Sequence, residues 1–213
     1  MAQQITAIRP QQKNKNRLSI FLDGEFAFGL TVDVAAPLQI GQTLTPEKIA
    51  TLQHEEALAT TRQLVWNYIS YRPRSRYEVE RHLHKKGIDA EIITTILDDL
   101  TARQHLDDYA FAQYWIEQRE AFKPRSHLAL RQELGQKRVA REIIDELLAD
   151  VDETAAALHV GQKKARRWQN LPADQFKQKM IRFLGQRGFA YPLIQTILPQ
   201  IMDTIEFPAE DNT

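Results

Sequence analysis

The stretch PRSRYEVERHLHKKG at residues 73–87 returns 51 residues later as PRSHLALRQELGQKR at residues 124–138. A further shift of 50 residues places LGQK, residues 134–137, on LGQR, residues 184–187. The chain therefore contains three repeats of about 50 residues. That period is typical of units with three short helices each, in which every unit covers apolar surface of its neighbour.

Helix boundaries can be predicted inside the first repeat. Pro73 ends one helix, because the residue before a proline is pushed away from helical dihedral angles. Ser75 and Glu78 form a capping box that begins a second helix. Gly87 closes this helix with a left-handed residue, and Asp89 caps a third helix with one apolar face. These signals predict three helices per repeat.

The first 45 residues have a different pattern. Apolar residues alternate over 18–22 and again over 26–30, and Asp23-Gly24 between them is a two-residue hairpin signal. Residues 5–8 are a candidate third strand. Because a lone hairpin is marginally stable in water, we expect it to pack on the helices or on that strand. We expect a linker within 31–45.

The predicted fold is mainly α, with three tandem three-helix repeats in an elongated, curved stack and a small N-terminal β-hairpin region. Thr45-Pro46 marks the first helix start, with threonine as cap and proline in the first turn. The predicted divisions are the hairpin extension 1–45, the repeats 46–106, 107–151 and 152–205, and a disordered tail 206–213.

Composition limits the class of protein. The 213 residues are 43% hydrophobic and 26% charged, and no apolar run approaches the roughly 18 residues of a membrane span. The N-terminus lacks a secretory pattern, so we expect a cytoplasmic protein that does not enter the membrane. The absence of cysteine excludes disulfides, thiolate metal sites and cysteine nucleophiles.

Charge is unevenly distributed although the formal net charge is zero. Residues 62–88 carry seven basic and two acidic groups, and 89–117 carry one and seven. Basic blocks at 118–141 and 159–188 likewise alternate with acidic ones. Partners respond to local fields over about 8–10 Å in physiological salt, so a neutral total does not exclude an anionic partner.

No catalytic or metal-binding constellation is predicted. The six histidines are scattered, and His82 and His84 are two residues apart on one helix, where a metal pair needs a spacing of three or four. Asp107-Asp108 is explained by a helix start and Asp98-Asp99 by a solvated face. The segment 185–188 is a helix-end pattern and lacks the context of a phosphate loop. We expect no enzyme activity, no cofactor and no metal.

The basic blocks are the candidate binding surface. Their cations recur at comparable positions in each repeat, so stacking would align them into a stripe suited to phosphates or to an acidic protein groove. Alternatively they are solvated or pair with the acidic third helices. We expect Trp66, Trp115 and Trp168 to be core residues. The candidate contact residues are Arg74, Arg76, Arg81, Lys85, Lys86, Arg125, Arg131, Lys137, Lys163, Lys164, Arg166 and Arg167.

These residues resemble the RecX family. The resemblance lies in PRSRYEV at 73–79 with Leu83, Lys86-Gly87, Leu106-Asp107-Asp108 and Ala110 after it, and in the order of the repeats over about 62–203. The hairpin is similar to the N-terminal segment of longer family members. Two positions depart from the family pattern: Arg138 stands in place of a helix-ending glycine, and Lys123 precedes Pro124 where glycine is common. We therefore expect the second helix of repeat two to end differently.

The resemblance implies a regulator, more specifically an inhibitor, of the RecA recombinase in DNA repair, recombination and the SOS response. Such a protein lies in the groove of the RecA–DNA filament and restrains ATP hydrolysis and strand exchange. Nucleic acid would be contacted directly or through the filament. The family has no catalytic residues to transfer, and we expect a monomer.

Two other classes of function stay open on the sequence alone. A stand-alone DNA-binding protein of tandem helix-turn-helix-like units would bind bare DNA with a steep salt dependence. A protein scaffold would use its charged stripes only to hold neighbouring repeats together, and it would respond to neither DNA nor filament.

Overall fold

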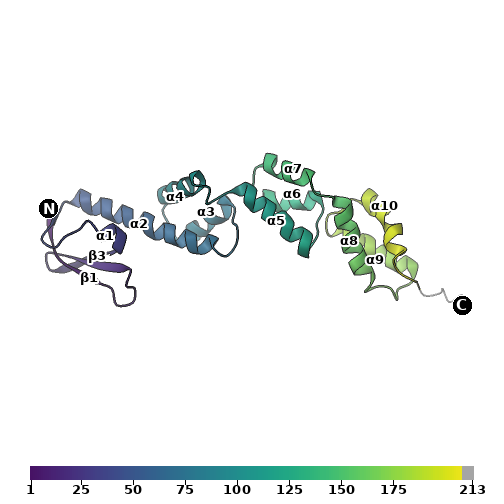
Figure 1. The fold of residues 1–213 in the computed structure, drawn as a ribbon, viewed down its shortest axis with the longest axis horizontal. Coiled ribbons are helices and arrows are strands. Elements are labelled where there is room, and N and C mark those ends of the chain that lie inside the picture. Colours follow the sequence, from purple (N-terminus) through teal and green to yellow (C-terminus); the bar gives the residue numbers. More distant parts are fainter. Residues whose placement is uncertain (208–213) are drawn as a thin grey trace. The chain divides into compact units, whose positions relative to one another are not determined.

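The computed structural model describes residues 1–207 and groups the chain into two compact units (Figure 1). The first contains residues 1–72 and 78–106. The second contains residues 73–77 together with the chain from 107 onward. The finer division into a hairpin region and three repeats stays a prediction, but four separate hydrophobic cores lie within these units.

The N-terminal region is a four-stranded antiparallel sheet, larger than the predicted hairpin. Its strands are β1 (Gln3–Pro10), β2 (Arg17–Leu22), β3 (Glu25–Thr31) and β4 (Thr43–Leu44), in the order β3-β2-β1-β4. The predicted hairpin turn is confirmed, because Asp23 and Gly24 have φ of 50° and 90°, the pair of positive values that a type I′ turn needs.

The expected linker within 31–45 is wrong. This segment forms helix α1 (Val32–Ala35) and strand β4, which pairs with β1. Ala35, Leu38 and Leu44 are buried in the sheet core. The segment looked like a linker because its apolar residues are too few and too irregularly spaced to show a period.

Helix α2 (Pro46–Ile69) covers the sheet with its first half and enters the first repeat with its second half (Figure 1). Its predicted start is confirmed, since the Thr45 side chain accepts a hydrogen bond from the Lys48 backbone N–H at 3.3 Å. Leu52 is buried in the sheet core. Glu56 of the same helix pairs with Arg17 of β2 at 2.8 Å and accepts the backbone N–H of Thr31. Apolar packing and a partly buried ion pair therefore hold the sheet to the helix.

The first repeat adds α3 (Arg76–Lys85) and α4 (Ala90–Ala102) to the second half of α2. Val65, Val79, Leu83 and Ile96 are fully buried in its core. The predicted cap of α4 is confirmed, because Asp89 Oδ1 accepts the Glu91 backbone N–H at 2.9 Å.

The second and third repeats have the same three-helix plan. The helices are α5 (Asp108–Phe122), α6 (His127–Gly135) and α7 (Arg141–Ala149), then α8 (Glu153–Ala165), α9 (Ala173–Gly185) and α10 (Tyr191–Met202). Phe111 is fully buried in the core of the second repeat and Phe176 in that of the third. Asp107, Ser126 and Asp152 each cap a helix through the side chain.

In each of the three repeats, the middle helix is followed by one residue in the left-handed conformation. Its φ is 73° at Gly87, 56° at Arg138 and 89° at Gly188. The expectation that the second of these helices ends differently is wrong, since Arg138 adopts the glycine-like conformation. The Arg138 guanidinium lies 4.3 Å from the centre of the Tyr77 ring, a contact that offsets part of the backbone strain.

The predicted disordered tail 206–213 overlaps the described chain only at its start. The Phe207 ring lies 5.3 Å from that of Phe176 in an edge-on contact, so residue 207 packs on the third core. Residues 208–213 lie outside the described residues.

The left-handed conformation of Arg138 can be tested by comparing Arg138→Gly with Arg138→Ala. Both substitutions remove the contact with Tyr77, but only glycine relieves the strain of the left-handed backbone conformation. We expect the glycine variant to be more stable by about 1 kcal/mol, which raises the melting temperature by about 2–4 °C. Thermal denaturation followed by circular dichroism measures the difference, and equal melting temperatures would contradict this helix end.

Candidate nucleic-acid interface

The candidate cations of the first repeat differ in exposure. Arg81, Lys85 and Lys86 are exposed on α3 and on the turn after it, whereas Arg74 and Arg76 are half-buried. The Arg76 backbone N–H donates to Asp108 Oδ1 at 2.7 Å. Burial raises the pKa of Asp108, and this hydrogen bond opposes the rise. Arg81, Lys85 and Lys86 are thus accessible to a partner, while the segment that contains Arg76 is held to Asp108 by a hydrogen bond within the protein.

The candidate cations of the second repeat are engaged with the protein itself. Arg131 Nε lies 2.8 Å from Asp145 Oδ1, and this hydrogen bond lowers the pKa of the Asp145 carboxyl. The Lys137 ammonium lies 5.2 Å from the centre of the Trp115 ring. The pairing of basic residues with acidic third helices, which the sequence left open, therefore occurs at Arg131.

Arg125 belongs to a contact between the second and third repeats, within the second unit. Its Nη1 donates to the carbonyl oxygen of Gln186 at 3.0 Å, and the Ser126 backbone N–H donates to that of Arg187 at 3.1 Å. Ser126 is fully buried and its Oγ caps α6 by accepting from Ala129. We call these two hydrogen bonds, from Arg125 and Ser126 to the turn after α9, the inter-repeat clasp.

The clasp explains why glycine stands at position 188. A Cβ atom there would lie 2.5 Å from Ser126 Oγ, and φ is already 89°. Residues just after the first copy of the motif also contact the next repeat within the second unit: the Arg76 backbone N–H donates to Asp108, and the Tyr77 ring lies under Arg138. The second copy of the Pro-Arg-Ser sequence, and the two residues that follow the first copy, therefore join consecutive parts of the second unit.

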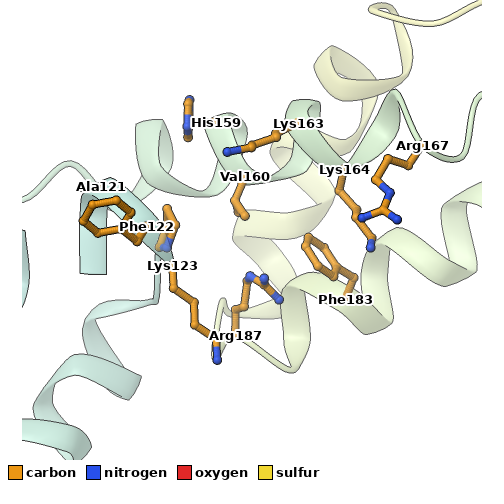
Figure 2. Close-up of a pocket in the computed structure, with 11 residues that line it drawn as sticks. Ala121, Phe122, Lys123, His159, Val160, Lys163, Lys164, Arg167, Phe183 and Arg187 are labelled. Atoms are coloured by element: carbon orange, nitrogen blue, oxygen red, sulfur yellow. The ribbon is translucent and has the colours of Figure 1, made fainter. Parts of the chain in front are cut away.

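Next to the clasp lies a pocket of about 240 Å³ (Figure 2). Three segments line it: the end of α5 with the residues up to Pro124, one face of α8, and the end of α9 with the turn after it. We call it the cationic pocket. Its polar side chains are Lys123, His159, Lys163, Lys164, Arg167 and Arg187.

Aromatic rings hold several of these cations in place. Arg187 lies with its guanidinium carbon 4.0 Å from the centre of the Phe183 ring, and Lys164 lies 4.8 Å from that of Trp168. Trp168 is half-buried against the third core, as expected of a core tryptophan. Burial, and secondly the neighbouring Arg125 guanidinium, lower the pKa of Arg187. Two guanidinium groups are thus held near each other beside an open space.

The structure brings only some of the predicted contact residues together. Lys163, Lys164 and Arg167 line the pocket, and Arg166 is exposed but is not among the lining residues. Sequence reasoning missed Lys123 and Arg187 as members of this group. Their meeting depends on the clasp, and the only signal was that Lys123 adjoins the repeated Pro-Arg-Ser motif while Arg187 lies in the repeated helix-end motif.

Family models match nearly the whole chain in order. They are the regulatory protein RecX N-terminal domain over residues 3–44 and the RecX first, second and third three-helix domains over 62–100, 107–148 and 150–198. The regulatory protein RecX of Bacillus licheniformis is 30% identical over 201 residues, covering 92% of this chain and 76% of the relative. That of Clostridium botulinum strain Alaska E43 is 28% identical, covering 93% and 96%.

The chain belongs to the RecX family. A crystal structure of regulatory protein RecX superposes with a TM-score of 0.71 at 26% identity and covers 92% of this chain and 99% of its own. RecX from Lactobacillus salivarius gives a TM-score of 0.60 at 21% identity over 69% of this chain and 97% of its own, which shows the shared fold. The sequence resemblance to this family is confirmed, and the N-terminal sheet region is part of it.

Among residues 1–207, no cluster of three or more histidine, aspartate or glutamate side chains is placed to hold a metal ion. Across the same residues, every helix is too short or too polar to cross a bilayer.

Arg125 takes part in the clasp, whereas Arg131 forms an exposed ion pair, so the two residues should differ in their contribution to stability. We expect Arg125→Ala to lower the free energy of unfolding by about 1.5–3 kcal/mol, because it removes a charge-assisted hydrogen bond to a backbone carbonyl at the clasp. Arg131→Ala removes an exposed ion pair and should cost under about 1 kcal/mol. Chemical denaturation of the two variants measures both losses; equal losses would show that the clasp contributes no more than a surface pair.

Proposed function

We propose that the protein inhibits a RecA-type recombinase by binding its filament on DNA and restraining ATP hydrolysis and strand exchange. Family membership over nearly the full length is the observation that carries this proposal. The resemblance described above implies that RecX proteins regulate RecA. The task is regulation by binding, without a catalytic residue or cofactor.

The distribution of charge supports a partner that contains nucleic acid. The exposed cations of α3 and the cationic pocket lie in different repeats, so phosphates can be contacted at more than one place along the chain. A filament of recombinase on DNA offers repeated phosphates and repeated protein subunits. A modular chain whose repeats each have their own core is suited to such a repeating partner.

A stand-alone DNA-binding function is the second candidate, and the cationic pocket favours it. Such a protein would bind bare DNA tightly, with a salt dependence that grows by about 0.9 in log–log slope for each duplex phosphate neutralised. It would act without a recombinase. The two candidates are therefore separated by whether the effect needs the filament.

The deciding measurement is the ATPase activity of RecA from the same organism on single-stranded DNA. We expect the protein to reduce ATP hydrolysis at ratios too low to coat the DNA, because each molecule on the filament affects more subunits than it covers. A parallel assay measures binding to the same DNA without RecA. Strong binding to bare DNA with unchanged ATPase activity would favour the stand-alone DNA-binding function instead. No effect in either assay would leave the protein scaffold as the remaining candidate.

The cations of the first repeat provide a second test. Lys85→Glu with Lys86→Glu should weaken filament binding and leave helicity and melting temperature unchanged, since both side chains are exposed at a helix end. Lys13→Glu with Lys15→Glu makes the same change of charge in the exposed turn between β1 and β2 and serves as the control. Equal weakening by both pairs would mean that only net charge matters.

A further inference from the structure

We propose that the cationic pocket binds one backbone phosphate of a single nucleic-acid strand and that Phe122 at its edge stacks on an adjacent base. This deepens the proposed function and rests on it for the choice of nucleic acid as the occupant. The pocket lies entirely within the second unit, so the argument needs only the geometry of that unit.

The lining of the pocket has one sign of charge. Lys123, Lys163, Lys164, Arg167 and Arg187 contribute cations, and none of the pocket-lining residues is acidic. Figure 2 shows these side chains arriving from α8, from the end of α5 and from the end of α9 around one open space. Like charges that are held together repel each other, and an anion between them removes that cost.

Arg187 is the residue that most favours an anion as the occupant of the pocket. Its Nε is buried and has no hydrogen-bond partner among residues 1–207. Buried donors in native proteins are nearly always paired, with protein, water or ligand. Because Phe183 stacks against the guanidinium, the group is fixed in position and cannot turn freely to solvent. A phosphate oxygen is a suitable acceptor for such a planar, fixed donor.

The shape of the site favours a strand over a free anion. Phe122 lines the same pocket and its side chain is 80% exposed, a costly placement for a large apolar ring without a partner. Proteins that bind single strands combine a cationic groove for the backbone with aromatic rings on which bases stack. A volume of about 240 Å³ accommodates a phosphate group, and a base stacked on the exposed Phe122 ring would lie at the edge of the pocket.

The test measures binding of the full-length chain to a fluorescent oligothymidylate over a range of salt concentrations. Lys163→Ala with Arg167→Ala removes two cations of the pocket. Lys177→Ala with Arg182→Ala makes the same change of charge outside it, at exposed positions of the same repeat. We expect only the pocket pair to lower the log–log salt slope, by about 0.7 for the single-strand phosphate that is no longer contacted.

The proposed stacking of a base on Phe122 is tested with a variant and a matched control. Phe122→Ala should weaken the same complex by roughly five- to a hundredfold, the range found when a stacking ring is removed. Tyr71 occupies the position of Phe122 in the first repeat and is 85% exposed, so Tyr71→Ala is the control, expected to leave the affinity unchanged. Both rings are exposed, so we expect both variants to fold, and circular dichroism checks this.

Several outcomes would overturn the inference. Equal weakening by the pocket pair and its control would show general attraction without a site. Displacement of the oligonucleotide by inorganic phosphate at equal phosphate concentration would show a free-anion site, and displacement by polyglutamate alone would show a site for an acidic peptide. Failure of the proposed function is distinguishable: a filament effect that survives in the pocket variants rejects only the pocket, whereas pocket-dependent binding to bare DNA without any effect on ATPase rejects only the regulation of RecA.

Discussion

The second unit depends on the inter-repeat clasp, in which the loop before one repeat's middle helix donates two hydrogen bonds to the turn after the next repeat's middle helix. The arrangement requires a short side chain that both caps a helix and fits against a turn, and Ser126 does both. At the corresponding place the third repeat has Asp174-Gln175-Phe176, and Phe176 is buried in its own core. The third repeat thus lacks the residues that form the clasp in the second repeat.

Most of the helical fold could be predicted because its signals are local. A cap such as Asp89 or Asp107 accepts hydrogen bonds from backbone N–H groups within three residues. It can therefore be recognised from neighbouring residues in the sequence alone. The left-handed end at Arg138 was missed for the opposite reason. Its compensating contact is with Tyr77, some sixty residues away, and a sequence pattern does not report such a distance.

The sheet shows the same limit. The hairpin was predictable because two alternating strands flank Asp23-Gly24, whereas β4 has only two residues and exists because β1 offers it an edge. The candidate site was predictable only in part. Lys163, Lys164 and Arg167 belong to one dense cluster, but Lys123 and Arg187 join them solely through the packing of one repeat on the next.

The clasp and the cationic pocket share the turn after α9. The turn that receives the hydrogen bonds from Arg125 and Ser126 also carries Arg187, so the joint between repeats is also what sets a cation beside the open space. Arg125 donates to Gln186 from Nη1 and lies 3.7 Å from Glu133 Oε1. Burial, and secondly the Arg125 guanidinium, lower the pKa of Arg187, whose buried Nε has no hydrogen-bond partner among residues 1–207. Joining the repeats therefore leaves unsatisfied positive charge at the joint, and an anionic strand bound there would stabilise the protein as well as be held by it.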